Sequence, residues 1–517
     1  MYISKIWLHN FKSFSGSHEL ELCDGINFFV GNNNCGKTTI FKAIEFIQSG
    51  KNKLDYITKG KEDENVCVEI EFSGKDIKDL VDSDHLNLSK YRQYITEIIG
   101  SNDEEPIYSI RVMRSSEETK LKSKKGVLDI KNVRVYNPSS REKEKIKRYE
   151  NPTGIDKTIT ALFDPQYVYS DLKNEDYQDF GKTKIVGKMI NDITREFQNE
   201  PIWRGFTESY REAFGEKGLS GILSGLEKEV SDILAEQYGE GEVEFDFAPP
   251  EIDILLKTGN ILLSDNGIKT PVSDKGTGMQ RALALSLIQV YAKKTNKLTN
   301  GIGKPIIFCI DEPETFLHPK AQDRLMEAFM QLSHRYQIFI TTHSPYLLKY
   351  YDKKSHQITI FSKGNNTSQV KSQDMLDLFS SYSPSWGEIN YFAFDVLSVE
   401  FHNELYGYMH YHIAEIDSNY SSITKFDNWL RDQSVKLLDA KEGYMDICKD
   451  DCIDLDYIRE SNGKMKIQKV TLPTIIRNII HHPENRNNNF STQQLDISTR
   501  LLVGIIKQFM NTEKQCD

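Results

Sequence analysis

The segment that most constrains the fold of this chain is residues 31–38, GNNNCGKT, which match the pattern Gly-x-x-x-x-Gly-Lys-Ser/Thr. The apolar run before it, Gly25–Val30, is typical of a buried strand, and Thr38–Ser49 has apolar residues at helical spacing. A glycine-rich turn between a strand and a helix N-terminus directs backbone N–H groups at phosphate oxygens. The pattern therefore predicts a nucleotide site in an α/β fold.

The residues of this loop differ in the role that we expect for each. Lys37 has the length and charge to reach the outer phosphates, and the Thr38 hydroxyl is a ligand for Mg²⁺. Glycine allows the backbone to approach phosphate closely, and asparagine tolerates the left-handed backbone of a tight turn. The residues that we assign here to ATP binding are Gly31, Asn34, Gly36, Lys37, Thr38 and Thr39.

A second polar cluster follows two apolar runs late in the chain. Pro305–Ile310 is continuously apolar, as expected of a parallel strand buried on both faces, and Asp311 and Glu312 follow it directly. We expect Asp311 to bind Mg²⁺, directly or through water, and Glu312 to polarise the attacking water. His343 follows the next apolar run, Gln337–Thr342, so we predict that His343 contacts the γ-phosphate.

The order of these segments favours an assembly of two subunits. Roughly 270 residues separate Thr38 from Asp311, far more than a compact P-loop fold requires. Between them, Gly276–Arg281 opens a helical run, and this second glycine-flanked helix N-terminus is a second geometry for binding phosphate. Because one nucleotide needs only one such cradle, we expect the second to complete the site of a partner subunit, with ATP between the two.

Composition excludes several classes of protein. A length of 517 residues suggests about two to four domains. The mean hydropathy is −0.52, and no apolar run reaches the roughly 18 residues of a membrane span. The first residues lack the apolar core of a secretory signal, and seven scattered cysteines argue against a disulfide framework. We therefore expect a cytoplasmic protein that does not contact a membrane.

The charge balance changes between the two groups of motifs. The chain has a formal net charge of −11, yet residues 111–148 hold thirteen Lys or Arg against five Asp or Glu. We favour a solvated, partly mobile hairpin here, and a surface that faces DNA or a protein partner is the alternative. Residues 185–238 then have apolar residues at helical spacing over a few turns, too short a stretch for a long coiled-coil arm.

The combined motifs resemble the ABC-type ATPase heads of the SMC, RecF and OLD superfamily. Asn10–Phe14 is similar to the N-F-x-S-F start of that family, whose basic residue, here Lys12, approaches the nucleotide. Thr277–Gln280 stands at the place of the S-G-G-Q signature, with Met279 departing from the second glycine as in OLD-like members. The resemblance implies that the signature residues close the nucleotide site of the partner subunit; these are Thr277, Gly278 and Gln280. The segments that match the Walker B, D-loop and switch-histidine motifs are Asp311–Glu314, Leu317–Pro319 and Thr342–Pro345.

This resemblance implies an α/β fold with an ABC-type P-loop ATPase head built from both chain ends, a helical insertion and a C-terminal helical domain. We predict head segments at 1–99, with Walker A, and at 266–375, with the signature, Walker B and switch histidine. Residues 100–265 are predicted as an insertion with a basic hairpin and a helical dimerisation region, and residues 376–517 as a helical partner-binding domain. Such a head is expected to form a homodimer or higher oligomer around MgATP and to hydrolyse ATP slowly.

Within the superfamily, the layout best resembles ATPases of bacterial antiphage defence. OLD nucleases carry a TOPRIM domain that needs a strand-end Glu and a later Asp-x-Asp pair. Glu400 is a candidate start, but Asp417 has no aspartate two positions on, so we do not expect an intrinsic nuclease. The layout resembles the ATPase subunit of Septu systems, also found beside retrons, which works with a separate HNH nuclease. DNA, or a retron reverse transcriptase with its msDNA, is a further expected partner. The alternatives are a PARIS-type sensor ATPase that sequesters a TOPRIM effector, and a RecF-type DNA-repair ATPase.

The C-terminal region has one motif that leaves several functions open. Arg477 and His482 have the Arg-x-x-x-x-His spacing of HEPN ribonucleases, in which the two residues act on an RNA phosphate. Against this, Pro483 biases His482 away from the helix. A structural role, binding of a partner or nucleic acid, and an ATP-gated RNase all remain open. Cys448 and Cys452 lack a second ligand pair, so we do not expect a zinc site.

Overall fold

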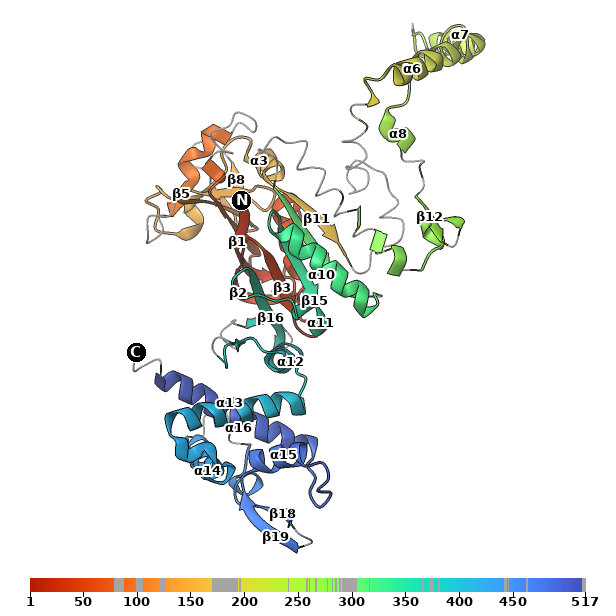
Figure 1. Ribbon diagram of the computed structural model, residues 1–517. Helices are drawn as coiled ribbons and strands as arrows, with labels where there is room; N and C mark the ends of the chain where they lie inside the picture. Colours follow the sequence, from red (N-terminus) through yellow and green to blue (C-terminus); the bar gives the residue numbers. More distant parts are fainter. Residues whose placement is uncertain are drawn as a thin grey trace. The chain divides into compact units, whose positions relative to one another are not determined.

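The computed structural model describes most of the chain in two compact units (Figure 1). One unit contains residues 1–167, 305–314 and 322–517, and the other contains residues 168–304 and 315–321. The described residues are 1–78, 88–98, 106–120, 126–169, 194, 197–239, 241–256, 259, 261–265, 267–276, 278–280, 282–283, 286–287, 290, 305–315, 317–364, 367–371, 376–379, 382–440, 444, 446–461 and 464–513.

The first unit has a six-stranded sheet whose centre is parallel. Its order is β11-β14-β15-β3-β16-β17, in which β14, β15, β3 and β16 pair in parallel and β17 pairs antiparallel with β16. Every residue of β3, β14 and β15 is buried, which explains why these strands are continuously apolar in the sequence. The strands are β3 (Ile26–Val30), β11 (Asp164–Val168), β14 (Ile306–Asp311), β15 (Gln337–Thr342), β16 (His356–Gly364) and β17 (Thr367–Lys371).

A second sheet in the same unit is antiparallel. Its order is β10-β9-β6-β4-β1-β2, and β5 pairs with β6 at one side. The sheet continues beyond residue 99, where we placed the first domain boundary, because β6, β9 and β10 come from the segment assigned to the insertion. The strands are β1 (Tyr2–Phe11), β2 (Phe14–Glu21), β4 (Cys67–Gly74), β5 (Ile95–Ile98), β6 (Ile107–Ser115), β9 (Arg134–Tyr136) and β10 (Tyr149–Glu150). Outside this sheet, β7 (Thr119–Lys120) pairs with β8 (Val127–Leu128).

Helix α1 (Thr39–Ser49) packs between the two sheets and forms the centre of the core. It follows β3 directly and contacts β4 and β6 of the antiparallel sheet. Phe41 lies 6.4 Å from Phe29 of β3, and Phe46 lies 5.5 Å from Phe11 of β1, measured between ring centroids. The apolar stripe predicted for this helix is therefore buried on two sides.

A buried glutamine joins the two ends of the head. The Gln337 side chain in β15 accepts a hydrogen bond from the N–H of Ile3 at 2.8 Å and donates one to the Ile3 carbonyl at 2.7 Å. It also donates to the Cys23 carbonyl at 2.8 Å. These contacts connect residues more than 300 positions apart. The prediction of an α/β head built from both chain ends is confirmed.

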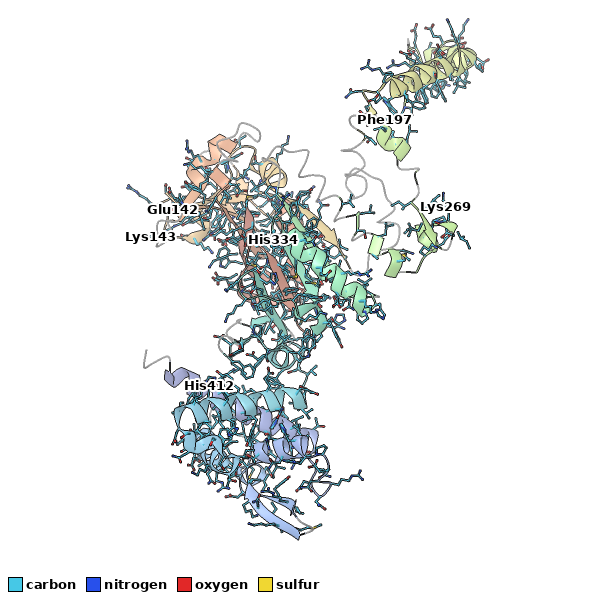
Figure 2. All side chains as sticks on the ribbon, viewed as in Figure 1. Glu142, Lys143, Phe197, Lys269, His334 and His412 are labelled. Atoms are coloured by element: carbon cyan, nitrogen blue, oxygen red, sulfur yellow. The ribbon has the colours of Figure 1, made fainter. Side chains whose placement is uncertain are left out.

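The basic segment 111–148 is not a simple solvated hairpin. Arg114 is buried and donates to the carbonyls of Ile47 and Gly50, and Arg134 is buried and donates to the carbonyl of Leu128. Charge in this segment thus holds loops against the sheet, where we had favoured a solvated surface and kept a DNA-facing surface as the alternative. Lys143, labelled in Figure 2, is exposed.

The C-terminal part of the first unit is mainly helical, as predicted, with one added β-hairpin. Helix α13 contacts α12, α14, α15 and α16, so it is the common partner of the group. Ser491 and Gln494 form a capping box at the start of α16, because each side chain accepts a hydrogen bond from the backbone N–H of the other residue. The elements are α12 (Trp386–Phe394), α13 (Val399–Ile416), α14 (Ile423–Asp439), β18 (Leu455–Ser461), β19 (Lys464–Val470), α15 (Leu472–His481) and α16 (Thr492–Glu513).

Two adjacent helices, α6 (Pro201–Phe214) and α7 (Leu219–Tyr238), dominate the described part of the second unit (Figure 1). Phe197, labelled in Figure 2, contacts Trp203 of α6 with ring centroids 6.0 Å apart. Further elements of the chain are α3 (Ile155–Leu162), α8 (Ile252–Leu256), β12 (Leu262–Asp265), β13 (Ile268–Pro271), α10 (Pro319–Ser333) and α11 (Pro345–Leu348). Among the described residues, no helix combines the length and the apolar character that crossing a membrane requires.

Candidate nucleotide site

The loop between β3 and α1 has a backbone that only glycine can form at two positions. Gly31 has a φ of +140° and Gly36 a φ of +96°. A Cβ atom on Gly31 would collide with the carbonyl oxygen of Phe361 in β16, and one on Gly36 would lie 2.6 Å from the Ser368 hydroxyl of β17. The loop is therefore held in a tight curve against the neighbouring strands, the kind of glycine-dependent turn that a phosphate cradle requires.

The polar residues of the loop differ in their contacts and exposure. Lys37 is only 5% exposed, and its ammonium group donates to the carbonyls of Gly31 at 2.8 Å and Asn32 at 3.0 Å. Asn34 is exposed and has a φ of +60°, the left-handed backbone that we expected of it. The Thr39 hydroxyl lies 3.4 Å from that of Ser13. The lysine is thus folded over the cradle rather than extended into solvent.

A hydrogen bond joins the phosphate loop to the carboxylate at the end of β14. The Thr38 hydroxyl donates to the Asp311 carboxylate at 2.8 Å, although 273 positions separate the two residues. The Thr341 hydroxyl of β15 also donates to the same carboxylate oxygen, at 2.5 Å, and Asp311 is 5% exposed. A buried carboxylate beside a hydroxyl is a set of hard oxygen donors, which fits Mg²⁺. The residues predicted for metal binding are therefore in contact and suited to the ion.

Glu312 lies just beyond the end of β14 in a strained conformation. Its φ is +45°, which is uncommon for a residue other than glycine. Two hydrogen bonds stabilise this conformation, because the N–H of Glu312 donates to the Thr341 carbonyl at 3.0 Å and to the Thr341 hydroxyl at 3.1 Å. The Glu312 carboxylate lies 3.5 Å from Nδ1 of His343, and both side chains are accessible to solvent, at 26% and 44% exposure. The strained backbone directs the carboxylate away from the core, toward the switch histidine.

Glu314 is a site residue that sequence reasoning missed. Its carboxylate accepts hydrogen bonds from the Thr342 hydroxyl at 2.7 Å and from the backbone N–H of His343 at 3.1 Å. The same oxygen lies 3.6 Å from the His343 ring, and burial raises the pKa of Glu314. Its position two residues after Glu312 was visible in the sequence, but nothing there indicated that it faces inward. Glu314 fixes the backbone that carries His343.

The N-F-x-S-F segment has left-handed backbone at two positions. Asn10 has a φ of +48°, is buried, and accepts the N–H of Gly16 through its side chain at 2.8 Å. Lys12 has a φ of +52° and is exposed, with its N–H bonded to the Tyr56 carbonyl at 2.7 Å and its ammonium group 5.2 Å from the Tyr56 ring centre. The turn thus leaves the Lys12 side chain at the surface.

The signature segment belongs to the second unit and is described in part. Thr277 lies outside the described residues. Gly278 is half-buried at the start of a helical stretch, and Met279 is exposed. Gln280 is 3% exposed, and its amide donates to the carbonyls of Lys275 at 2.5 Å and Ser273 at 3.2 Å. The glutamine that we assigned to the nucleotide therefore braces its own loop within this chain.

The candidates in the C-terminal region differ in their surroundings. Glu400 lies in the first turn of α13 and Asp417 caps its other end, whereas a TOPRIM pattern needs a glutamate at a strand end. Arg477 lies on α15, and His482 caps that helix with non-helical backbone, in agreement with the bias from Pro483. Both border the same groove, which also has lining from α14 and the β-hairpin.

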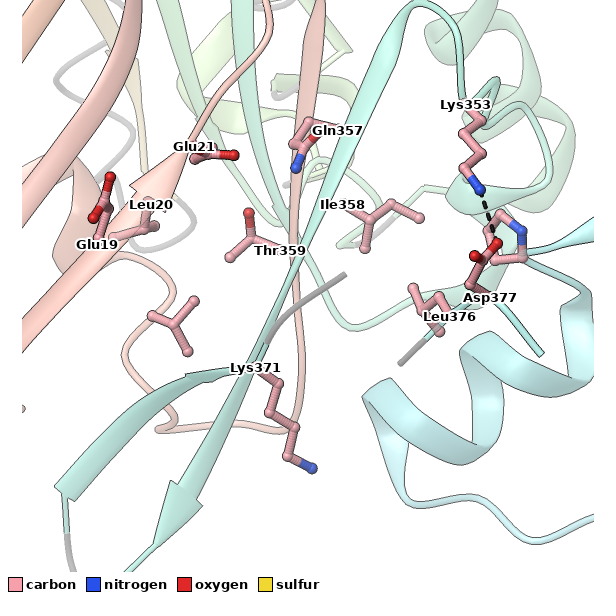
Figure 3. Close-up of a pocket in the computed structure, with 12 residues that line it drawn as sticks. Glu19, Leu20, Glu21, Lys353, Gln357, Ile358, Thr359, Lys371, Leu376 and Asp377 are labelled. Atoms are coloured by element: carbon pink, nitrogen blue, oxygen red, sulfur yellow. Dashed lines mark hydrogen bonds and ion pairs between the residues drawn. The ribbon is translucent and has the colours of Figure 1, made fainter. Parts of the chain in front are cut away.

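Another hollow of the first unit, of about 610 Å³, lies beside β2 and β16 (Figure 3). Lys353 and Asp377 at its edge form an ion pair of 2.9 Å. The residues of the phosphate loop do not line it. This hollow is therefore distinct from the candidate nucleotide site.

Comparisons with known proteins identify one curated relative and several similar solved structures. The chain is 27% identical over 252 residues to the Old nuclease of Escherichia phage P2, a match that covers 46% of this chain and 42% of the nuclease. The chain thus matches less than half the length of this curated relative.

Two solved structures are similar to the chain at low sequence identity. An SMC head bound to the C-terminal winged-helix domain of ScpA is similar over 72% of this chain and 98% of the other, with 15% identity and a TM-score of 0.40. The SMC head domain from Thermotoga maritima covers the same shares with 14% identity and a TM-score of 0.33.

A family assignment covers the motifs described above. The AAA ATPase domain family matches residues 1–348, more than half of the chain, and this span includes the phosphate loop, Asp311, Glu312 and His343. Together with the similarity to the Old nuclease, this match agrees with the resemblance to ATPases of the SMC, RecF and OLD superfamily. The chain belongs to the AAA ATPase domain family.

Proposed function

We propose that this protein binds MgATP in the cradle of residues 31–38 and hydrolyses it slowly. The observation that carries the proposal is the 2.8 Å hydrogen bond between Thr38 and Asp311, which joins the phosphate loop to the end of β14. When bound there, Mg²⁺ would neutralise charge on the phosphates. Lys37, released from the loop carbonyls that it now contacts, has the charge and length to replace those contacts with phosphate oxygens.

Hydrolysis would depend on the accessible pair Glu312 and His343. A carboxylate at the Glu312 position can accept a proton from a water molecule, and a neighbouring imidazole can donate to a phosphate oxygen. Their 3.5 Å separation and their exposure to solvent support these roles. Glu314 would act on the reaction through His343, as a positioning residue, because it holds the backbone of the histidine.

We further propose that two copies associate around the nucleotide. A signature segment, with Gly278 at the start of a helical stretch, supplies a second phosphate-binding geometry that the phosphate loop does not need. Helix α7 adds an exposed apolar stripe at helical spacing, which is an expected dimer surface. The stripe consists of Ile222, Leu226, Val230 and Ile233.

The biological role that we propose is regulation of a separate nuclease in bacterial antiphage defence, with an HNH-type partner favoured. The similarity to a phage nuclease over 252 residues, together with a helical C-terminal region whose Glu400 and Asp417 do not fit a TOPRIM site, supports an ATPase that acts through another protein. A PARIS-type sensor that holds a TOPRIM effector is the second candidate.

Substitution of Glu312 by Gln tests the core of this proposal. The amide keeps the shape of the side chain but cannot accept the proton, so we expect at least about a hundredfold loss of ATP hydrolysis with ATP binding retained. Light scattering after chromatography should show an ATP-dependent dimer that is longer-lived than in the wild-type protein. Glu327→Gln, on the exposed face of α10, is the matched control. A Glu312→Gln protein that binds ATP and remains monomeric at every concentration would contradict the two-subunit site.

A further inference from the structure

A groove on the C-terminal helical part has a charge opposite to that of the whole chain. It has a volume of about 870 Å³ and lies between α14, α15 and the β18–β19 hairpin. That volume is in the range of ligand-binding sites, roughly 300–1,000 Å³. Five basic side chains border it, from the hairpin, α15 and the residue that caps α15; they are Arg459, Lys466, Lys469, Arg477 and His482. Because the whole chain has a net charge of −11, a local cluster of basic side chains indicates a surface that attracts an anionic ligand.

Two of these cations are placed in an unfavourable arrangement. Arg459 and Lys466 are directly opposite each other in the antiparallel register of the hairpin, and like charges in this position destabilise a pair of strands. Neither has an ion-pair partner in the part of the chain that the structure describes, and the same is true of Arg477. Lys469, by contrast, pairs with Asp456 at 2.9 Å. Three unneutralised cations therefore border one groove.

The acidic residues at the groove do not cancel this charge. Asp427 is buried, and its carboxylate accepts the N–H of Thr471 at 3.1 Å and the hydroxyl of the same residue at 2.7 Å. Glu484 is exposed at the rim, 3.2 Å from His482. Four side-chain amides also border the groove and can donate and accept hydrogen bonds; they are on Asn428, Gln468, Asn478 and Asn485. The groove thus combines cations for phosphate with amides suited to base edges.

We propose that this groove binds a short stretch of single-stranded nucleic acid, with Arg459, Lys466 and Arg477 at its phosphates. Unpaired lysine and arginine side chains along a groove are the usual means of following a phosphodiester backbone. A groove of this size holds a few nucleotides but is too small to enclose a duplex. The site is separate from the proposed ATPase centre, and binding there does not depend on the proposed function.

Fluorescence anisotropy of the full-length protein tests this site. The probes are labelled single strands of about 12 nucleotides, one DNA and one RNA of the same sequence, and the corresponding DNA duplex. We expect the double variant Arg459→Ala, Lys466→Ala to bind single strands at least about tenfold more weakly. Because single strands release roughly 0.7 counterions per phosphate contact, the slope of log affinity against log salt should fall in magnitude by about 1.4.

A second double variant, Lys425→Ala, Lys436→Ala, removes the same charge from exposed positions of α14 outside the groove, and should bind as the wild type does. Equal binding of DNA and RNA would indicate recognition of the backbone, and preference for RNA would indicate contacts with the 2′-hydroxyl. The proposal is overturned if the wild-type protein binds neither strand, if it binds the duplex as tightly, or if both double variants lose affinity alike. Because the assay needs no ATP, such a failure would leave the proposed ATPase function standing.

Discussion

The candidate nucleotide site and the C-terminal groove are built in opposite ways. At the nucleotide site the shape comes from backbone, with left-handed residues in the loop and at Glu312, and its key polar residues Lys37 and Asp311 are almost fully buried. At the groove, exposed side chains such as Arg459 and Lys466 project from regular secondary structure. A site made of backbone tolerates little change, whereas a site made of exposed side chains loses its function gradually as charges are removed.

Of the substitutions that test this difference between the two sites, Gly31→Ala should have the largest effect on stability and ATP binding. The new Cβ would collide with the Phe361 carbonyl in a backbone region that disfavours alanine, so we expect a loss of roughly 3 kcal/mol or more in stability and of ATP binding. Gly60→Ala is the matched control, because Gly60 also has a positive φ, +84°, but has nothing within 4 Å of its Cβ position. Its cost should be about 1 kcal/mol. Thermal unfolding measures the stability of the two variants, and a fluorescent ATP analogue measures their nucleotide binding. Equal losses in Gly31→Ala and Gly60→Ala would show that the collision with Phe361 does not matter.

Glu314→Gln should have an intermediate effect that separates positioning from catalysis. The amide oxygen can still accept from the Thr342 hydroxyl, but the charge facing His343 is lost, so we expect kcat to fall about five- to tenfold with little change in KM. Because burial raises the pKa of Glu314, wild-type activity should decline on acidification at a higher pH than an ordinary carboxylate would cause. The Gln variant should lack that decline. An unchanged pH profile would show that the carboxylate has only a structural role.

The last effect that we expect concerns the pH dependence of stability, through His402 in the helical region, and it leaves the nucleotide site unchanged. Burial lowers the pKa of His402 to about 3, and its Nε2 lies 2.8 Å from the Ser498 hydroxyl. The folded state therefore keeps the ring neutral, while the unfolded chain protonates it below a pH of about 6.5. Stability should be fully present above that pH and fall by roughly 1.4 kcal/mol per unit as the pH drops toward 3.

His402→Gln should flatten this dependence. Urea unfolding followed by tryptophan fluorescence at pH 7.5 and 5 measures it, and His412→Gln, on the same helix (Figure 2), is the control. If wild type and His402→Gln lose the same stability on acidification, the buried ring does not carry the effect.

The sequence predicted the elements around the phosphate loop well because their signals are local. The apolar runs of β3, β14 and β15, the stripe of α1 and the motif residues are each readable within a window of a few residues. The sequence did not predict that the antiparallel sheet continues past residue 99, because short strands such as β9 and β10 have weak patterns of their own. The inward turn of Gln280 and the burial of Arg114 and Arg134 also depend on contacts distant in sequence or on loop geometry.

By itself, the sequence of this protein determined the phosphate loop, the carboxylates after β14 and the two-ended α/β head, because glycine conformation and apolar runs act over short distances. Only the tertiary structure decided that Thr38 reaches Asp311, that Glu314 holds the backbone of His343, and that Arg459, Lys466 and Arg477 border one groove. These contacts join residues from separate elements. Whether two such side chains meet depends on how the elements pack, and a short window of sequence does not predict that packing.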